Sequence, residues 1–393
     1  MDSIELLQLI DKGETSDVQF KQEVTDPSKV AAELVAFSNA QGGKLIIGVA
    51  DNLDIIGLSD AQIETIGQLV ANVSTNNIAP PINVISEIVV VDEAKIMVIY
   101  VKDGSGKPYK DNKGVIWMKN GSDKRKVLDN NEILRLFQKG GSYYADESVI
   151  VNTTINDVNQ ESFERYYGLL SESTLEADGI PYLTALENTL VIREDKVTLG
   201  GLLFFGKNPQ QYRPAFCVKA ISFIGNDLEG TSYRDSEDIN GTLPSIFERS
   251  ISFITRNLNR VQARQGFNTE GNLEIPKLVL EEIIQNALVH RDYFINDAIK
   301  IFIYDNRVEI ISPGVLPNSL TIDQIKFGRS VVRNNNVITF ANKLMPYRGI
   351  GSGIRRSIKA VPNIEFDNDL NRQCFVVTIP RSSVEVAVTL EEE

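Results

Sequence analysis

One acid, one amide and the only histidine of the chain stand four residues apart as Glu282, Asn286 and His290. On a helix that turns by about 100° per residue, these side chains follow one stripe, because each step of four residues drifts by only about 40°. A carboxylate on such a stripe can polarise water, an amide oxygen can hold a hydrated Mg²⁺ ion, and an imidazole can orient a phosphate. The stripe therefore predicts ATP chemistry if phosphate-binding backbone lies nearby.

A glycine-rich segment further along the chain could supply that backbone. Gly349, Gly351 and Gly353 stand at alternate positions, and Arg355, Arg356 and a run of helical composition follow them. Glycine lets backbone N–H groups approach an anion closely, and a helix N-terminus adds a favourable dipole. The segment therefore predicts a phosphate cradle.

Two strand-like runs and a glycine turn lie between the stripe and the cradle. Residues 298–304 and 308–311 are rich in apolar and β-branched residues, and a polar turn separates them. A Ser-Pro-Gly turn at 312–314 leads to a long polar segment, 317–348. The expected order is helix, hairpin, glycine turn, polar segment and cradle.

This order and several local motifs resemble a known ATP-binding fold. The motifs are residues 287–293, 312–314, 333–334 and 349–353. They are similar to the GHKL (Bergerat-type) fold of gyrase, MutL and histidine kinases, and specifically to the divergent RecG-like branch of bacterial ATP-binding regulators. The resemblance implies a C-terminal GHKL-type α/β sandwich with ATP and Mg²⁺ as cofactors.

The resemblance also assigns roles by position. Glu282 would activate water, Asn286 would ligate Mg²⁺, and segment 317–348 would close over the nucleotide as a lid. In the wider fold an aspartate hydrogen-bonds the adenine base at the position where this chain has Ser312. The hydrogen bond of a serine is weaker, because a hydroxyl lacks the charge of a carboxylate. The residues implied in nucleotide binding are Asn286, His290, Ser312, Gly314, Arg329, Arg333, Asn334, Gly349, Gly351 and Gly353.

Other interpretations of these residues were weighed against this one. The stripe could be an ordinary exposed helix face. Residues 290–292 imitate a protein-kinase catalytic loop, but the sequence has no Asp-Phe-Gly after them and no glycine-rich strand and lysine before them. Residues 104–107 suggest a P-loop, yet proline follows and the upstream glycine spacing is wrong. A Ser-His-Asp triad would have to use His290 itself.

Composition is typical of a globular chain of two or three domains. Of 393 residues, 42% are hydrophobic and 24% are charged. No apolar run approaches the roughly 20 residues of a membrane span, and no signal peptide begins the sequence, so we expect a cytoplasmic protein without membrane contact. Cys217 and Cys374 lie in apolar contexts that predict buried thiols, and a single histidine disfavours a zinc site.

Residues 1–130 are expected to form one α/β module. A helix over 4–10 precedes a strand, and Asp26-Pro27 begins a second helix, because aspartate caps a helix and proline fits its first turn. A buried-type strand over 44–49 and a hairpin over 82–101 follow. Motifs in this region resemble the Schlafen/AlbA-type DNA-binding domain; they are residues 14–21, 35–43, 47–51 and 107–109.

The formal net charge of −13 repels nucleic acid on average, so nucleic-acid binding requires a local basic patch. Residues 102–126 supply one, with Tyr109 and Trp117 interleaved as in a surface that combines phosphate contacts with base stacking. The alternative is a solvated hairpin face. The expected contacts with DNA, or with RNA, are Lys107, Lys110, Lys113, Lys119, Lys124, Arg125 and Lys126.

Nuclease activity is the enzymatic alternative for the same module. Some Schlafen-like proteins cleave RNA with three acids, which by position would be Glu14, residue 19 and Asp51. Gln19 stands at the second position, and a metal-dependent nuclease needs carboxylate charge to hold its cations.

The middle of the chain is expected to connect these two modules. We expect a helix and linker over 131–150 and a mixed α/β region over 151–270. Within that region, residues 200–206 and 216–224 are strand-like, and 244–261 indicate a long helix. Residues 271–393 then form the ATP-binding domain.

The expected fold class is therefore α/β (α+β), with a Schlafen/AlbA-like module, a connecting region and a GHKL-type domain. The function that these features predict is an ATP-binding and nucleic-acid-binding regulator, most simply of transcription. In it, Mg-ATP binding or slow hydrolysis controls the N-terminal module. The alternatives are an ATP-regulated Schlafen-like nuclease and a nucleotide-gated assembly protein without turnover. Analogy with GHKL proteins adds homo-oligomerisation.

Overall fold

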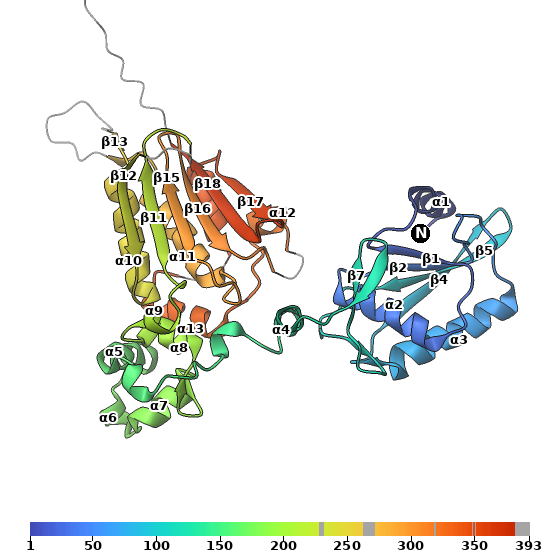
Figure 1. The fold of residues 1–393 in the computed structure, drawn as a ribbon, viewed down its shortest axis with the longest axis horizontal. Coiled ribbons are helices and arrows are strands. Elements are labelled where there is room, and N and C mark those ends of the chain that lie inside the picture. Colours follow the sequence, from blue (N-terminus) through green and yellow to red (C-terminus); the bar gives the residue numbers. More distant parts are fainter. Residues whose placement is uncertain (228–231, 262–271, 318–319, 348, 350, 382–393) are drawn as a thin grey trace, which may run out of the picture. The chain divides into compact units, whose positions relative to one another are not determined.

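A computed structural model describes residues 1–227, 232–261, 272–317, 320–347, 349 and 351–381. The chain divides into two compact units, Met1–Tyr143 and Tyr144–Glu393 (Figure 1). Both units combine helices with mixed sheets, which confirms the expected α+β class. The boundaries expected at 130, 150 and 270 stay predictions. In the described part of the chain, no helix is long and apolar enough to cross a membrane.

The N-terminal unit is built on a four-stranded sheet in the order β1-β2-β5-β4. Its strands are β1 (Val18–Lys21), β2 (Gly43–Ile47), β4 (Val84–Val91) and β5 (Ala94–Val101). β1 and β2 are parallel, and the other pairings are antiparallel. The predicted hairpin is confirmed, with Asp92 and Glu93 at positive φ in its turn.

Helices cover both faces of this sheet, because successive side chains of a strand point to opposite faces. Leu45 and Ile47 pack with α2 (Pro27–Asn39) and α3 (Asp60–Asn76), whereas Ile46 packs with α1 (Ser3–Lys12). The predicted start of α2 is confirmed, since the Asp26 carboxylate accepts a hydrogen bond from the Ser28 N–H at 2.8 Å. The unit also contains four short strands and one further helix: β3 (Ile78–Ala79), β6 (Lys110–Asp111), β7 (Trp117–Asn120), β8 (Asp123–Lys126) and α4 (Asn130–Lys139).

The C-terminal unit contains a six-stranded sheet in the order β12-β11-β15-β16-β18-β17. Its strands are β11 (Val218–Phe223), β12 (Tyr233–Ile239), β15 (Ile299–Ile303), β16 (Arg307–Pro313), β17 (Glu365–Asp369) and β18 (Cys374–Pro380). β11 and β15 are parallel, and the remaining neighbours are antiparallel. Cys217 and Cys374 are buried free thiols, as predicted.

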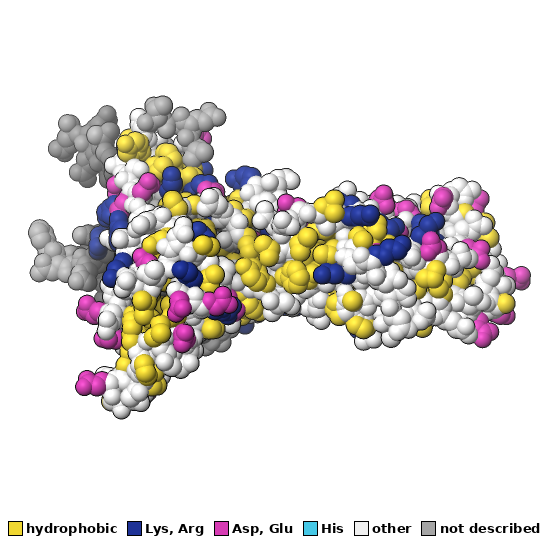
Figure 2. Space-filling model, turned by 60° about the horizontal axis from the view of Figure 1, so that its bottom comes forward, with side chains coloured by type: hydrophobic (Ala, Val, Ile, Leu, Met, Phe, Trp, Pro, Cys, Tyr) yellow, Lys and Arg dark blue, Asp and Glu magenta, His cyan; other side chains and the backbone are white. Residues whose placement is uncertain are grey.

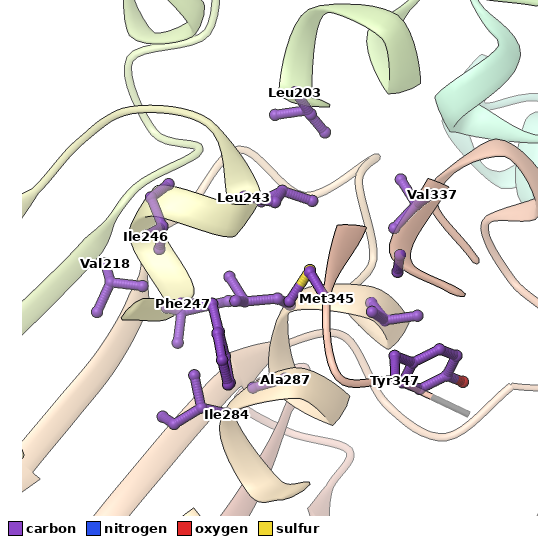
Figure 3. Packing of buried hydrophobic residues seen from close by; sticks show 14 of the residues in the cluster. Leu203, Val218, Leu243, Ile246, Phe247, Ile284, Ala287, Val337, Met345 and Tyr347 are labelled. Atoms are coloured by element: carbon purple, nitrogen blue, oxygen red, sulfur yellow. The ribbon is translucent and has the colours of Figure 1, made fainter. Parts of the chain in front are cut away.

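Two long helices, α10 (Leu243–Asn257) and α11 (Lys277–His290), lie against one face of this sheet (Figure 1). Figure 3 shows Phe247 of α10 packed near Ile284 and Ala287 of α11, with Met345 close by. α10 is shorter than expected, because the chain leaves the helix after Asn257 and forms β13 (Arg260–Val261), which pairs with β14 (Asn272–Leu273).

A helical layer packs onto the same hydrophobic core through an aromatic cluster of Phe163, Tyr166, Phe205 and Phe340. Most of its elements precede the sheet in sequence, and α13 (Asn335–Leu344) follows β16. The others are η1 (Ala145–Glu147), η2 (Ile155–Asp157), α5 (Gln160–Ser171), α6 (Leu175–Asp178), α7 (Tyr182–Asn188), β9 (Ile192–Arg193), β10 (Lys196–Val197), α8 (Leu199–Phe205) and α9 (Pro209–Tyr212). Two further helices lie outside this layer: α14 (Gly353–Ala360) contacts α11, and α12 (Ile322–Lys326) contacts α14 and β17.

The strand expected over residues 200–206 is wrong, because these residues form helix α8. The Thr198 hydroxyl caps α8 by accepting a hydrogen bond from the Gly201 N–H at 3.0 Å. Every residue of α8 is buried, so the sequence carries no polar face from which a helical period could be read. Gly201 is required at its position, because a Cβ there would overlap with the Val191 carbonyl.

Candidate functional site

A cavity in the C-terminal unit is lined by the predicted stripe of α11. Glu282, Asn286 and His290 all contribute to its wall. The side chains of Glu282 and Asn286 are joined, since the Asn286 Nδ2 donates to Glu282 Oε1 at 3.0 Å. The other carboxylate oxygen, Oε2, lies 3.5 Å from Nη2 of Arg356. The amide of Asn286 therefore keeps its Oδ1 as the atom that could ligate a cation.

His290 lies at the C-terminal end of α11 and is held as a neutral imidazole. Burial, followed by the charge of Arg333, lowers its pKa from 6.5 to about 4. Its Nε2 lies 3.0 Å from the Tyr347 hydroxyl, whose own pKa burial raises to about 12. A neutral imidazole beside a neutral phenol forms a hydrogen-bonding pair that carries no net charge at pH 7.

The glycines of both predicted boxes allow close approaches that other residues would block. Gly314 has a φ of 102°, and a Cβ there would overlap with Asp292. Gly351 has a φ of 69°, and a Cβ there would overlap with the carbonyl of Gly328. At Gly353 the added Cβ would overlap with the carboxyl group of Glu282. The second box is therefore in direct contact with the acid of the stripe.

The remaining nucleotide-binding predictions fall into two groups. Ser312, Gly314, Arg329, Arg333, Gly349, Gly351 and Gly353 line the cavity with the stripe. Asn334 lies beneath the described wall: it is fully buried, and its Nδ2 donates to the carbonyls of Val289 and Arg291, both at 2.9 Å. It thus fixes the end of α11. The described residues do not include residues 318–319 and Arg348 of the predicted lid. They also do not include Ile350 of the second glycine box.

Ser312 and Arg333 bind protein backbone as well as lining the cavity. The Ser312 hydroxyl donates to the Ala287 carbonyl at 3.1 Å, which leaves its oxygen lone pairs to accept from a ligand. Arg333 donates to the carbonyls of His290 at 3.3 Å and Val315 at 2.6 Å, and it is buried. Arg333 therefore ties the predicted lid segment to the end of α11.

Sequence reasoning missed Tyr347, Arg356 and an apolar wall of the cavity. The wall includes Ile325, Phe366, Phe375 and Val377, which come from distant segments. Arg356 could have been suspected, because it follows the glycine-rich segment in a helical run. The spacing of Tyr347 and of the wall residues in the sequence does not predict that they line the cavity. The wall is brought together by the pairing of β17 with β18, and Tyr347 lies in the segment that follows α13.

The basic segment of the N-terminal unit is divided between exposed and buried side chains. Lys113, Arg125 and Lys126 are exposed, and Lys110 and Lys124 are partly buried. Figure 2 shows Lys and Arg side chains gathered on one part of this unit. Lys107 and Lys119 are 5% and 8% exposed, so they lie beneath the surface where phosphate contacts were expected.

The buried lysines support the shape of the segment. Lys107 donates from Nζ to the Ala40 carbonyl at 2.7 Å, and Lys119 donates from Nζ to Gln19 Oε1 at 2.8 Å. Burial lowers the pKa of Lys119, and the nearby carboxylate of Glu33 opposes this shift. Lys124 also pairs with Glu33, at 2.5 Å.

The interleaved aromatic residues are positioned inward as well. Tyr109 is buried, and its backbone N–H and carbonyl are both bonded to the buried amide of Asn39, at 2.8 and 2.9 Å. The Trp117 indole N–H donates to Asp111 at 2.9 Å, and Trp117 also bonds Asn39 through its carbonyl at 2.9 Å. The base-stacking role expected for Tyr109 is therefore wrong in this structure, because its ring belongs to the core of the unit.

The alternative nuclease positions comprise two acids, Glu14 and Asp51, and the amide of Gln19. Glu14 accepts hydrogen bonds from the Gln19 amide and from the Phe20 N–H, the latter at 2.9 Å. Asp51 is exposed in the turn after β2. Among the described residues, no group of three or more His, Cys, Asp and Glu side chains could hold a metal ion.

Three family models match separate parts of the chain. Residues 14–128 match "Schlafen, AlbA_2", and residues 296–377 match "Putative ATP-dependent DNA helicase recG C-terminal". Residues 134–219 match a domain of unknown function, DUF8451. The chain thus contains a Schlafen/AlbA_2 domain and a RecG C-terminal-like domain, as the sequence motifs predicted. The second match begins after α11, so Glu282, Asn286 and His290 lie outside it.

The solved structures that match this chain include two proteins of low sequence identity. The DIP2311 protein from Corynebacterium diphtheriae is 18% identical, with a TM-score of 0.47 over 96% of this chain and 80% of that chain. The N-terminal domain of a "Putative ATP-dependent DNA Helicase RecG-related Protein" from Nitrosomonas europaea is 20% identical, with a TM-score of 0.24. It covers 33% of this chain and 96% of that chain. No curated protein sequence matches this chain.

Proposed function

We propose that this protein is a regulator, most simply of transcription, whose C-terminal cavity binds Mg-ATP and whose N-terminal unit contacts nucleic acid. The observation that carries the proposal is a shared cavity wall, in which Glu282, Asn286 and His290 meet both glycine segments. Acid, amide, neutral imidazole and exposed backbone are the groups that a polyphosphate and its cation require. The RecG C-terminal-like match over 296–377 supports the same assignment.

Within the cavity, each group of the stripe has a distinct proposed role. Glu282 accepts a proton from the attacking water, and the neutral His290–Tyr347 pair offers hydrogen bonds to phosphate oxygens. Asn286 provides an oxygen ligand suited to Mg²⁺, which proteins commonly hold through one or two side chains together with substrate phosphates. When bound, Mg²⁺ would neutralise charge on the phosphates.

The apolar wall and Ser312 support a purine base at the other end of the cavity. Phe366, Phe375 and Val377 provide an apolar surface on which a base can pack. Because the Ser312 hydroxyl donates to Ala287, its oxygen can accept a hydrogen bond from an exocyclic amine such as that of adenine.

We infer that the domain expected over 271–393 is a divergent GHKL-type sandwich. The placement of α11 and α14 beside the sheet, with β15, β16, β17 and β18 adjacent in it, supports this inference. In such a domain the predicted lid, residues 317–348, includes both α12 and α13.

A continuous set of contacts could couple the cavity to the start of the C-terminal unit. Asn334 holds the end of α11, and α13 begins at the next residue. The buried carboxylate of Asp146 accepts a hydrogen bond from the Val337 N–H of α13 at 2.8 Å. Asp146 lies just after Tyr144, where this unit begins. ATP shifts this path only if its affinity differs between two states of the lid.

In the N-terminal unit, we propose that the exposed basic residues contact phosphate groups. These are Lys113, Arg125 and Lys126, assisted by the partly buried Lys110 and Lys124. Lys107 and Lys119 would act by holding the segment in place. The Schlafen/AlbA_2 match over 14–128 supports nucleic acid as the partner.

The test is fluorescence anisotropy of labelled duplex DNA and single-stranded RNA, titrated with the full chain with and without ATP and Mg²⁺ across a salt series. The proposal expects salt-sensitive binding that changes when Mg-ATP is added. Glu282→Ala should abolish ATP hydrolysis while sparing ATP binding, and Asn286→Ala should lose the Mg²⁺-dependent part of the affinity.

Two outcomes would favour the alternatives. Cleavage of the labelled strand that disappears in Glu14→Ala or Asp51→Ala would make the protein a nuclease. Nucleotide-dependent oligomerisation with no nucleic-acid binding would make it an assembly protein. Equal loss of ATP binding and hydrolysis in Glu282→Ala would refute the role of Glu282 as the acceptor of the water proton.

A further inference from the structure

Arg356 lines the cavity but belongs neither to the stripe of α11 nor to the glycine boxes. It lies on α14, three residues after Gly353, and it lines the cavity with Glu282. Its Nη2 lies 3.5 Å from Glu282 Oε2, and its side chain is 47% exposed. The guanidinium is thus partly solvated and loosely paired, and exposed pairs of this kind are weak enough to exchange partners.

Both oxygens of the Glu282 carboxylate are engaged in this arrangement. Oε1 accepts from Asn286 at 3.0 Å, and Oε2 faces Arg356 at 3.5 Å. A carboxylate that is to take a proton from water needs an oxygen directed at that water. Each carboxylate oxygen can accept a second hydrogen bond, but the positive charge of Arg356 beside Oε2 makes that oxygen a weaker proton acceptor, so opening this contact favours hydrolysis.

The contact with Arg356 is the one that can open readily. Asn286 lies one helical turn from Glu282 on α11, so the backbone fixes their spacing. Arg356 comes from another helix on a long side chain, and its contact with Glu282 is the longer of the two. A phosphate dianion is a better partner for a guanidinium than a carboxylate shared with an amide, because it accepts two parallel charge-assisted hydrogen bonds.

We propose that Arg356 senses the terminal phosphate of ATP, exchanging its contact with Glu282 for one with the γ-phosphate and thereby freeing Glu282 for catalysis. This inference rests on the proposed function of the cavity. With ADP no γ-phosphate is present, so Arg356 stays on Glu282 and the acid remains engaged. Arg356 then determines the preference for triphosphate over diphosphate.

The exchange fits a balanced hydrolysis step. The oxygen of water forms a bond to the γ-phosphorus, and the bond from that phosphorus to the bridging oxygen breaks, with the electron pair leaving on ADP. The proton of water passes to the freed Oε2 of Glu282. Arg356 meanwhile offsets the negative charge of the γ-phosphate, which would otherwise repel the Glu282 carboxylate.

The experiment is calorimetric titration of the full chain with a non-hydrolysable ATP analogue and, separately, with ADP, both with Mg²⁺. Arg356→Met removes the charge and keeps most of the side-chain length. It is expected to weaken binding of the ATP analogue by about tenfold to a hundredfold, the range for a lost hydrogen bond to a charged group. Binding of ADP should change by less than about twofold. Arg356→Lys keeps the charge without the planar fork and should restore part of the difference.

Lys359→Met is the matched control, because Lys359 is exposed on the same helix and lies outside the described wall of the cavity. It should leave both affinities unchanged. Equal weakening of both ligands in Arg356→Met, or an effect no larger than that of Lys359→Met, would overturn the inference while leaving ATP binding intact. If the wild-type chain binds neither nucleotide, the proposed function itself fails. Thermal unfolding of each variant separates misfolding from these outcomes.

Discussion

Glu132 of α4 holds Arg125 of β8 through two parallel hydrogen bonds. Nη1 of Arg125 donates to Oε2 of Glu132 at 3.0 Å, and Nη2 donates to Oε1 at 2.5 Å. The hydrogen bonds with the Glu132 carboxylate raise the pKa of Arg125 above its usual value. Arg125, the one arginine among the residues expected to contact nucleic acid, is therefore already paired with a carboxylate, with which a phosphate group must compete.

We expect Glu132→Gln to tighten nucleic-acid binding, because it removes the competing charge and leaves Arg125 available to phosphate. The gain should be about threefold to tenfold at low salt and should shrink as salt is added. Anisotropy with labelled duplex DNA measures it. Glu64→Gln on α3 removes the same charge from an exposed position of the same unit and is the control. A gain of the same size in both variants would mean that only the net charge matters.

The basic segment should separate into phosphate-binding and structural lysines. Lys113→Ala should lower the salt dependence of log K by about 0.9, the value for one lost phosphate contact on duplex DNA. Lys12→Ala is the control, because Lys12 is exposed on α1, which packs on the other face of the sheet from α2.

Lys119→Met should instead destabilise the N-terminal unit, since the buried Glu33 and Gln19 lose a partner. Its salt slope for nucleic-acid binding should match that of wild type. Urea unfolding followed by fluorescence of Trp117, the only tryptophan, reports on this unit. A salt slope reduced as in Lys113→Ala, with unchanged stability, would place Lys119 at the nucleic-acid surface.

The two glycines at the start of α14 should respond differently to alanine. In Gly353→Ala the new methyl group meets the end of the flexible Glu282 side chain, so the fold survives while the acid is displaced and hydrolysis falls. In Gly351→Ala the methyl group meets the backbone of Gly328, and φ is 69°, so stability falls by about 1–3 kcal/mol. Thermal unfolding and phosphate release measured on both variants distinguish these effects. Similar loss of stability in both would contradict the assignment of Gly353.

Asp146 should make the C-terminal unit less stable as pH rises. Burial raises its pKa from 3.8 to about 6, so between these values the folded state keeps a proton that the unfolded chain releases. Ionising this group in the folded state costs roughly 3 kcal/mol, at about 1.4 kcal/mol per pKa unit. Asp146→Asn cannot ionise, so its stability relative to wild type should increase from about pH 4 to about pH 7. Denaturant unfolding at several pH values measures it, and parallel curves would refute the prediction.

His290 should have the opposite pH dependence in the same unit. Its pKa is lowered from 6.5 to about 4, so as pH falls through this range the unfolded chain binds a proton that the folded state excludes. Stability is therefore lost on acidification, by roughly 3 kcal/mol in full. His290→Asn should be relatively more stable at about pH 4.5 than at about pH 7, compared with wild type. A difference that does not vary with pH would mean that the pKa of His290 is the same in the folded and unfolded states.

Features whose cause is local could be predicted from the amino-acid sequence alone. The cap and proline that begin α2 act within one turn, and the spacing of Glu282, Asn286 and His290 puts them on one stripe of any helix. Both Cys217 and Cys374 were recognisable as buried thiols from their apolar neighbours. Local chemistry of this kind needs no knowledge of distant segments.

Tertiary structure decided what depends on contacts between distant segments. Residues 199–205 form a helix that is buried on all sides. Such a helix has no polar face, so the periodic pattern that would predict it is absent from the sequence. Charge alone made Lys119 resemble Lys113, yet one is enclosed by Gln19 and Glu33 and the other is exposed. The contact of Arg356 with Glu282 joins residues 74 positions apart. Composition and spacing cannot specify such contacts, because burial and pairing are set by how the elements pack and not by the residues themselves.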